Sequence, residues 1–280
     1  MNHPLDAESP EATGELEIDL LLEALFQRFG IDFRAYERAA LRVKLHELMR
    51  SRALATISQV QDRALHDPAT RAALLRTLSV QPGFLFDDPV QARQLRTVLA
   101  SSLRASAVPK VWLAECAGAE EAWSLAILLA DEQLHRRTEV FATVANEDML
   151  ADVDDASIPM ERMEQTQQNY LKSGGTANLA DYFEIRGKRA VLVPALRSRI
   201  TWAQYNLVTD ASFNEFQLIV CKRALVDFGP ALRRRTLQLF HDSLALFGVL
   251  GLDRELDDGD SLRANYVPVF AHQAWYKRIA

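Results

Sequence analysis

The chain has 280 residues, of which 49% are hydrophobic and 25% are charged, and its formal net charge is -6. This composition is typical of a globular protein, and a chain of this length can bury the core of one larger domain with a smaller companion. The negative charge argues against nucleic acid as a partner, no apolar run approaches the ~20 residues of a membrane span, and the acidic start is unlike a signal peptide. We expect a cytoplasmic protein that binds no nucleic acid and does not insert into a membrane.

The cysteines and histidines do not indicate a metal centre or a disulfide framework. Only two cysteines occur, Cys116 and Cys221, and both end apolar, strand-like runs. Two are too few for a disulfide framework, so we expect small buried side chains. The six histidines are scattered and lack the spacing of metal-binding motifs. We therefore expect no resident metal ion.

The first part of the chain is predicted to be helical after a short disordered leader. Residues 1–14 are acidic, contain prolines and a glycine, and show no apolar period, which is typical of disorder. Beyond them, apolar residues recur at helical spacing as far as the glycine- and proline-containing segment QPGFLFDDP. This pattern predicts a helical N-terminal domain over residues 15–88. Its expected helices cover residues 16–30, 34–53, 56–66 and 68–78.

After Pro109, short apolar runs alternate with helical segments. The runs include KVWLAEC, EVFATVA, ITWAQYNL and FQLIVCK, and the helix after the last of them is expected from about Pro230 to Phe247. Such alternation predicts parallel strands joined by right-handed crossovers, hence an open α/β sheet within residues 89–280. A segment at about 182–205, with Arg186-Gly187 near a turn, predicts a small antiparallel β-subdomain inserted into this domain.

The carboxyl ends of the strands are where a ligand is expected. In open α/β sheets the ligand crevice lies at these ends, near the point where the strand order reverses. Four strand exits are therefore of interest. They are residues 114–119, 144–148, 205–208 and 221–227.

Several short motifs, in this order, resemble the CheR-type methyltransferases. They are A-x-C-x-x-x-E-E-x-x-S-L-A from Ala114, F-A-T from Phe141, N-L at Asn206, and F-x-L-I-V-C-x-x-x-L-V-x-F from Phe216. The resemblance covers about residues 15–280. It implies a helical N-terminal domain, a Rossmann-like methyltransferase domain with an inserted β-subdomain that can dock receptors, and methyl transfer from S-adenosylmethionine to glutamate side chains of chemoreceptors.

Position by position, the resemblance implies a cofactor pocket in which several residues depart from the family. Glu120 and the pair Asn206-Leu207 match the family, whereas Glu115 stands at a family glycine. A glycine there lets the ligand approach bare backbone, which a side chain obstructs. Val144 stands at the acid that binds the ribose hydroxyls, and losing such hydrogen bonds costs ~1.5 to 3 kcal/mol unless the loop shifts and another polar residue substitutes. The complete set of expected pocket positions is Glu115, Glu120, Val144, Asn206, Leu207, Lys222 and Arg223, with Asn146 or Glu147 as the substitute for the ribose contact.

Two further blocks also depart from the family. The segment N-x-T-x-F-F-R, which precedes the sheet in the family, reads QPGFLFD here, so Gly83 replaces threonine and Asp87 replaces arginine. In the block C-R-N-V-L-I-Y-F, Arg223 replaces asparagine and Asp227 replaces the tyrosine near the reacting centre. The departures thus fall at the pocket, while the apolar framework is kept.

We expect Glu115 and Arg223 to form an ion pair inside the vacated crevice, because the first and fourth strands of this fold are neighbours. Removing one partner of a well-buried pair costs ~3 to 5 kcal/mol. The alternative is that both side chains point to solvent from loosened loops.

Three functions remain open. The first is a catalytically inactive CheR-like protein, without a catalytic residue or a cofactor, that binds a protein partner in a bacterial signalling pathway. The second is an active, divergent S-adenosylmethionine-dependent protein-glutamate O-methyltransferase. The third is a receptor for another small nucleotide, using Lys222, Arg223 or the basic insertion. The β-subdomain is either the docking element for the partner or a solvated hairpin. The cations of the insertion are Arg186, Lys188 and Arg189.

Overall fold

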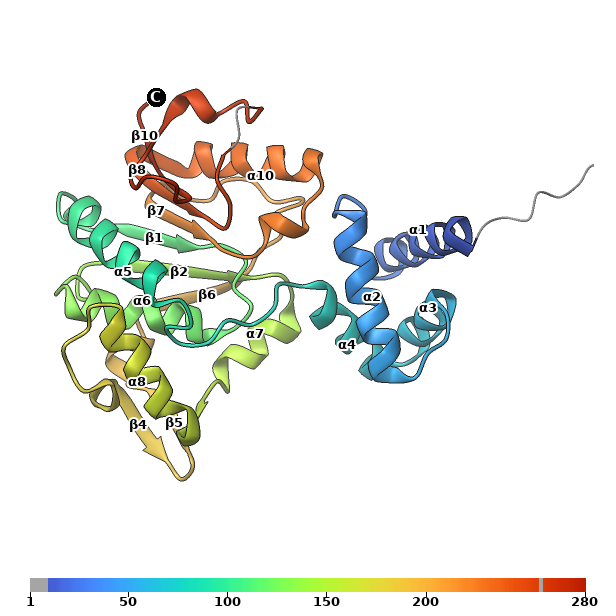
Figure 1. Cartoon of the computed structure of the whole chain (residues 1–280), viewed down its shortest axis with the longest axis horizontal. Helices are drawn as coiled ribbons and strands as arrows, with labels where there is room; N and C mark the ends of the chain where they lie inside the picture. The colour runs from blue at the N-terminus through green and yellow to red at the C-terminus, as the bar shows by residue number, and fades with distance from the viewer. Residues whose placement is uncertain (1–9, 257–258) are drawn as a thin grey trace, which may run out of the picture. The chain divides into compact units, whose positions relative to one another are not determined.

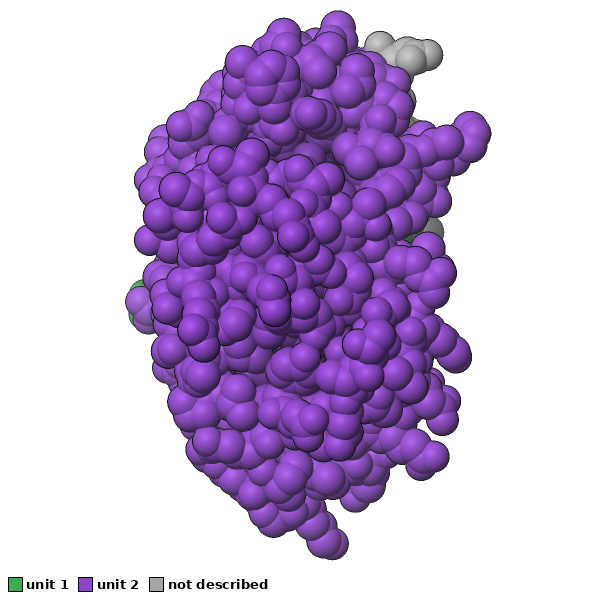
Figure 2. Space-filling view, turned by 90° about the vertical axis from the view of Figure 1, so that its left-hand side faces the viewer, with its two compact units in different colours: residues 1–79, 227–232 green, residues 80–226, 233–280 purple. Residues whose placement is uncertain are grey.

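The computed structural model of the chain describes residues 10–256 and 259–280, which form two compact units (Figure 1). Unit 1 comprises the described residues up to Ser79 together with Asp227–Leu232, and unit 2 comprises Val80–Val226 and Arg233–Ala280 (Figure 2). Residues 80–88, expected at the end of the helical domain, therefore belong to unit 2.

Unit 1 is built from helices whose apolar faces meet in one core. The buried side chains include Leu21, Leu45 and Leu74. Asp67 accepts hydrogen bonds from the backbone of the first turn of the last of these helices, as an N-cap residue does. The helices are α1 (Pro10–Phe29), α2 (Arg38–Arg52), α3 (Ile57–His66) and α4 (Pro68–Leu78).

Of the expected disordered leader, residues 1–9 lie outside the described residues. Residues 10–14 were expected in the leader, but they are the first turn of α1. The prediction failed there because a helix can begin at a proline, whose missing N–H is not needed in the first turn.

A short segment distant in sequence completes unit 1. Tyr36 and Phe228 form an antiparallel bridge, and their rings meet edge to face at 5.0 Å. The backbone of Gly229 donates a hydrogen bond of 2.9 Å to the oxygen of Ala35. A Cβ atom at Gly229 would lie 2.7 Å from that oxygen, so only glycine permits this approach.

Unit 2 contains a seven-stranded sheet with the order β6-β2-β1-β7-β8-β10-β9 (Figure 1). The first five strands in this order are parallel, and β10 is antiparallel to both of its neighbours. The predicted open α/β sheet is confirmed, as is the pairing of its first strand, β1, with its fourth, β7. The strands are β1 (Lys110–Leu113), β2 (Glu139–Val144), β6 (Ile200–Gln204), β7 (Phe216–Cys221), β8 (Leu244–Leu252), β9 (Tyr266–Pro268) and β10 (Trp275–Arg278).

Most helices of unit 2 lie between strands of the main sheet along the chain. The central strands β1 and β7 are buried on both faces and therefore read as continuous apolar runs. The helix expected to reach Phe247 ends at Ser243, because β8 begins at Leu244. The helix α8 was not predicted. The helices are α5 (Pro89–Val98), followed by a π-helical turn (Leu99–Leu103), α6 (Ala119–Asp131), α7 (Glu147–Asp154), α8 (Met163–Lys172), α9 (Pro194–Arg197) and α10 (Pro230–Ser243).

The inserted β-subdomain is a three-stranded antiparallel sheet with the order β3-β5-β4. Its strands are β3 (Ile158–Pro159), β4 (Phe183–Arg186) and β5 (Arg189–Leu192). The predicted hairpin is confirmed, and Gly187 in its turn has a φ of 62°. The expected range of 182–205 extends too far, because Ile200–Gln204 pairs in parallel with β2 and belongs to the main sheet.

Candidate functional site

Glu115, at the exit of β1, has a left-handed backbone conformation, which is more usual for glycine than for a residue with a side chain. Its φ is 59°, in the left-handed region that glycine favours, and the residue is buried. Its N–H lies 3.4 Å from the hydroxyl of Thr143, and the N–H of Cys116 donates to the carbonyl of Thr143 at 2.7 Å. Gly118, with a φ of 175°, is extended and does not supply the left-handed position. Glu115 therefore holds a left-handed conformation at a position where the resemblance implies glycine.

The exit of β2 offers an apolar side chain where the resemblance implies an acid. Val144 is fully buried, and its carbonyl accepts a hydrogen bond of 3.0 Å from the N–H of Tyr205. Asn146, the expected substitute, caps α7 by accepting a hydrogen bond of 3.0 Å from the N–H of Met149. Val144 thus provides no carboxylate for the ribose contact that the resemblance implies. The carboxamide oxygen of Asn146 is already used to cap α7.

Both carboxylate oxygens of Glu120 bind protein groups. Arg162, in the turn before α8, donates from its two terminal nitrogens to Oε1 and Oε2 at 2.8 and 2.7 Å. The N–H of Leu85 donates to Oε2 at 2.8 Å. The guanidinium of Arg162 also lies over the ring of Phe84, 4.1 Å from its centroid. A two-point ion pair of this kind fixes both partners and occupies the acid.

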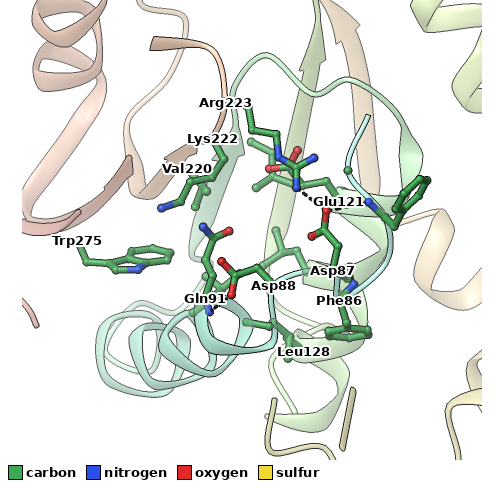
Figure 3. A pocket seen from close by; sticks show the side chains of 17 residues that line it. Phe86, Asp87, Asp88, Gln91, Glu121, Leu128, Val220, Lys222, Arg223 and Trp275 are labelled. Atoms are coloured by element: carbon green, nitrogen blue, oxygen red, sulfur yellow. Dashed lines mark hydrogen bonds and ion pairs between the residues drawn. The ribbon is translucent and has the colours of Figure 1, made fainter. Parts of the chain in front are cut away.

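Asp87 and Arg223, two departures from the family, form an ion pair with each other. The distance between Nη2 of Arg223 and Oδ2 of Asp87 is 2.5 Å, and both side chains are partly exposed (Figure 3). The N–H of Phe84 also donates to Oδ2, at 3.1 Å. The guanidinium lies so close to Gly83 that a Cβ atom there would meet Nη1 at 2.1 Å. Glycine at position 83 is therefore what makes room for Arg223.

The structure gives Arg223 an ion-pair partner that the sequence did not predict. The sequence predicted a buried ion pair with Glu115, whereas the structure pairs Arg223 with Asp87, and 39% of the arginine side chain is exposed. The reason is that the segment before α5 brings Asp87 to this strand exit. The reversed charge at position 87 and the new cation at position 223 thus compensate one another. A contact between Glu115 and Arg223 stays a prediction.

Asn206 and Leu207, the pair that matches the family, are engaged locally. The carboxamide oxygen of Asn206 accepts a hydrogen bond of 2.8 Å from the N–H of Val208, and the N–H of Asn206 donates to Asp210 at 2.9 Å. Leu207 is buried. These contacts stabilise the turn after β6.

Lys222 is a buried cation at the exit of β7. Its ammonium donates a hydrogen bond to the carbonyl of Leu252 and lies over the ring of Trp275, 4.7 Å from the centroid. Burial lowers the pKa of Lys222 to about 8. Asp227, at the family's tyrosine position, belongs to unit 1, where its carboxylate accepts from the ammonium of Lys44 at 2.6 Å.

A small cavity lies among these residues in unit 2 (Figure 3). Its volume is about 60 Å³, which holds about two water molecules, whereas pockets for small ligands measure ~300 to 1,000 Å³. Of the seven expected cofactor positions, Lys222 and Arg223 line this cavity and the other five do not. Glu121 also lines it, and burial raises the pKa of Glu121 to about 7. Sequence reasoning missed Glu121, although it is the second acid of the E-E pair.

The described part of the chain offers neither a cluster of metal ligands nor a membrane-spanning helix. Among residues 10–256 and 259–280, no three histidine, cysteine, aspartate or glutamate side chains are grouped as a metal ion would require. Within the same ranges, no helix combines the length and the apolar character needed to cross a membrane.

The sheet order and the inserted antiparallel sheet define unit 2 as a Rossmann-like methyltransferase domain. Residues 85–255 match the model of the CheR methyltransferase, SAM binding domain, and residues 16–79 match that of the CheR methyltransferase, all-alpha domain. The chain therefore belongs to the CheR methyltransferase family.

Three relatives illustrate the similarity. A protein of Pseudomonas putida with the name "Putative methyltransferase Cher3" is 33% identical over 96% of this chain and 98% of its own length. The chemotaxis protein methyltransferase Cher2 of the same organism is 22% identical over 86% of this chain and 90% of its own. A chemotaxis protein methyltransferase of Listeria innocua is 28% identical over 50% of this chain and 51% of its own. These identities mark the chain as a divergent member.

Proposed function

We propose that this chain is a CheR-family protein that does not transfer methyl groups and that acts as a binding or regulatory component of a bacterial signalling pathway. The observation that carries the proposal is the state of Glu120, whose two carboxylate oxygens are held by Arg162 and by the N–H of Leu85. The signalling context is supported by relatives whose names place them in chemotaxis.

Glu120 would have to leave Arg162 before it could contact a cofactor, and the free energy lost would weaken cofactor binding strongly. To contact S-adenosylmethionine, Glu120 would have to give up two charge-assisted hydrogen bonds to Arg162, each worth ~1.5 to 3 kcal/mol. Together they correspond to a factor of ~10² to 10⁴ in affinity. The buried Val144 adds the loss of the ribose contacts that the family resemblance implies. Both effects act against cofactor binding.

An active, divergent methyltransferase is the principal alternative. Methyl transfer from a sulfonium to a carboxylate depends mainly on the alignment of donor and acceptor, so no single departure would abolish it. The alternative requires Arg162 to release Glu120 when the cofactor arrives. A nucleotide receptor is less favoured, because the guanidinium groups of Arg186 and Arg189 bind Glu184 and Ser157, respectively.

Isothermal titration calorimetry with S-adenosylmethionine and S-adenosylhomocysteine tests the proposal. We expect a Kd of ~0.1 mM or weaker for both, because a loss of ~10² or more brings a micromolar affinity to that range. The variant Arg162→Ala, which frees Glu120, should bind more tightly than the natural chain, and Arg186→Ala, on the β-subdomain, should not. Micromolar binding by the natural chain, or transfer of radiolabelled methyl from the cofactor to a protein, would refute the proposal.

For the partner, we propose the β-subdomain as the docking element. Its strand β4 is at the edge of the three-stranded sheet, and Ile185 on this strand is exposed. Such an edge can accept an added strand from another chain.

A further inference from the structure

A second cavity of unit 2, larger than the first, lies at the carboxyl ends of β7 and β8. Its volume is about 360 Å³, within the range of ~300 to 1,000 Å³ that small-molecule sites occupy. It shares four wall residues with the small cavity, and Figure 3 shows these side chains beside one another. The shared residues are Asp88, Gln91, Lys222 and Trp275.

The wall contains a carboxylate oxygen that has no hydrogen-bond donor. Asp253, directly after β8, lines the cavity. Backbone N–H groups of Val226, Leu225 and Asp253 itself lie near its carboxylate. The N–H of Val226 donates a weak hydrogen bond of 3.4 Å to Oδ2, whereas Oδ1 is buried and makes no hydrogen bond to a described residue. A buried acceptor without a donor is costly and therefore rare in folded proteins. A bound molecule that donates a hydrogen bond to Oδ1 would explain why this buried oxygen lacks a donor from the protein.

Lys222 does not fill this role. The ammonium of Lys222 donates to the carbonyl of Leu252 and faces the ring of Trp275. Trp275 is itself held in place, because its indole N–H donates to the side chain of Gln94 at 2.9 Å. The cavity thus has an aromatic wall whose orientation is fixed.

The charges around the cavity favour a positively charged ligand. Three carboxylates line it, those of Asp88, Asp253 and Glu255, against the two cations Lys222 and Arg254. An anion would meet this excess of negative charge, whereas a cation would be attracted by it. An ammonium or guanidinium group also brings several N–H donors, which is what Oδ1 of Asp253 lacks.

We propose that this cavity binds a small molecule that carries an ammonium or guanidinium group. The charged group donates to Asp253, and the aliphatic part lies against Trp275. The site lies at the exits of β7 and β8. Of the expected cofactor positions only Lys222 lines it, and the groups that contact the ligand, Asp253 and Trp275, are not among them.

Agmatine, which carries both a guanidinium and an ammonium group, is the probe. Calorimetry without S-adenosylmethionine should show saturable binding that weakens as salt is added, because the attraction is electrostatic. Glutarate, a dicarboxylate of similar length, should not bind. The variant Asp253→Asn should weaken agmatine binding tenfold or more, and Glu139→Gln, at the amino end of β2, should not change it.

Three results would overturn the proposal. They are the absence of saturable heat at ~10 mM agmatine, where any specific site should fill, equal binding of glutarate, and unchanged affinity in Asp253→Asn. If Asp253→Asn does not fold by circular dichroism, Glu255→Gln provides the same test at an exposed position, and a loss of affinity is again required.

Discussion

The guanidinium of Arg223 lies in space that only a glycine at position 83 leaves free. A Cβ atom at Gly83 would come within 2.1 Å of Nη1, and Arg223 would have to move away from Asp87. Arginine is long and flexible, so the movement itself is easy. What is lost is the ion pair, which at this exposure is worth up to ~1 kcal/mol.

We expect Gly83→Ala to be less stable than the matched variant Gly118→Ala by up to ~1 kcal/mol in urea denaturation. Both replacements reduce the freedom of the unfolded chain equally, but a Cβ atom at Gly118 meets nothing within 4 Å. Asp87→Asn should then have little further effect in the Gly83→Ala background. Full additivity of the two substitutions would show that Gly83 does not support the ion pair.

Glu121 and Lys222 make the stability of unit 2 depend on pH in opposite directions. Burial raises the pKa of Glu121 from an ordinary 4.5 to about 7, so between these values the folded state holds more protons and stability falls as pH rises. Burial lowers the pKa of Lys222 from 10.5 to about 8, so in that window stability rises with pH. Arg223 moderates the shift of Glu121 and Asp253 moderates that of Lys222, whereas the negative charge of Asp87 adds to the shift of Glu121.

Between about pH 7 and 8, Glu121 and Lys222 are both charged in the folded state. The free-energy cost of burying each charge therefore applies in full in this range. We expect the contribution of these two groups to stability to be lowest there. Denaturation of Glu121→Gln from pH 4.5 to 7 should lack the fall seen in the natural chain, and Lys222→Met should lack the rise from pH 8 to 10.5. Parallel curves for the natural chain and both variants would contradict the assignment.

At the scale of elements, the ion pair between Glu120 and Arg162 joins the start of α6 to the turn before α8. Both side chains are largely covered, at 19% and 30% exposure. We expect Arg162→Ala to lower the free energy of unfolding by ~3 kcal/mol, the lower end of what two charge-assisted hydrogen bonds contribute, because the pair is partly exposed. Arg162→Lys should recover only part of this, because an ammonium cannot bind both oxygens in the same fork geometry.

The matched control is Arg186→Ala, whose ion pair with Glu184 is exposed. Its effect should stay below ~0.5 kcal/mol, as is usual for exposed pairs. Equal effects of Arg162→Ala and Arg186→Ala would show that the link between α6 and α8 is not stabilising.

The sequence predicted the order of the elements because their signals are local. Apolar spacing located α2, α3 and α4 to within a few residues, and continuous apolar runs located β1, β2 and β7. The partner of Arg223 was not predictable in this way, because Asp87 is 136 positions away and reaches it only through the fold. The role of Asn146 could have been read from its place just before α7, where asparagine is a common N-cap.

Asp227, which stands at the family's tyrosine position, belongs to the helical unit 1. Lys44 donates to Asp227 at 2.6 Å and to the carbonyls of Leu78 and Ser79 at about 3 Å. The charged side chains are only 13% and 15% exposed. The departure from the family at this position therefore replaces a residue of the reacting centre by one that ties a distant segment to unit 1.

We expect Lys44→Met to lower the stability of unit 1 by ~3 kcal/mol, because it leaves the carboxylate of Asp227 without its cation. Circular dichroism reports the helices of both units, whereas all four tryptophans lie in unit 2 and report that unit alone. The urea midpoint should therefore fall more by circular dichroism than by tryptophan fluorescence. Lys188→Met, at an exposed position, is the control. If Lys44→Met and Lys188→Met had the same urea midpoint, the role of the ion pair between Lys44 and Asp227 would be contradicted.

We propose that side chains of the protein itself occupy the groups that would hold S-adenosylmethionine. The decisive experiment is a crystal structure of the chain grown with millimolar S-adenosylhomocysteine. We predict no nucleoside at the exits of β1 and β2, with Arg162 on Glu120 and Arg223 on Asp87. A nucleoside bound there, with Glu120 released from Arg162, would contradict it.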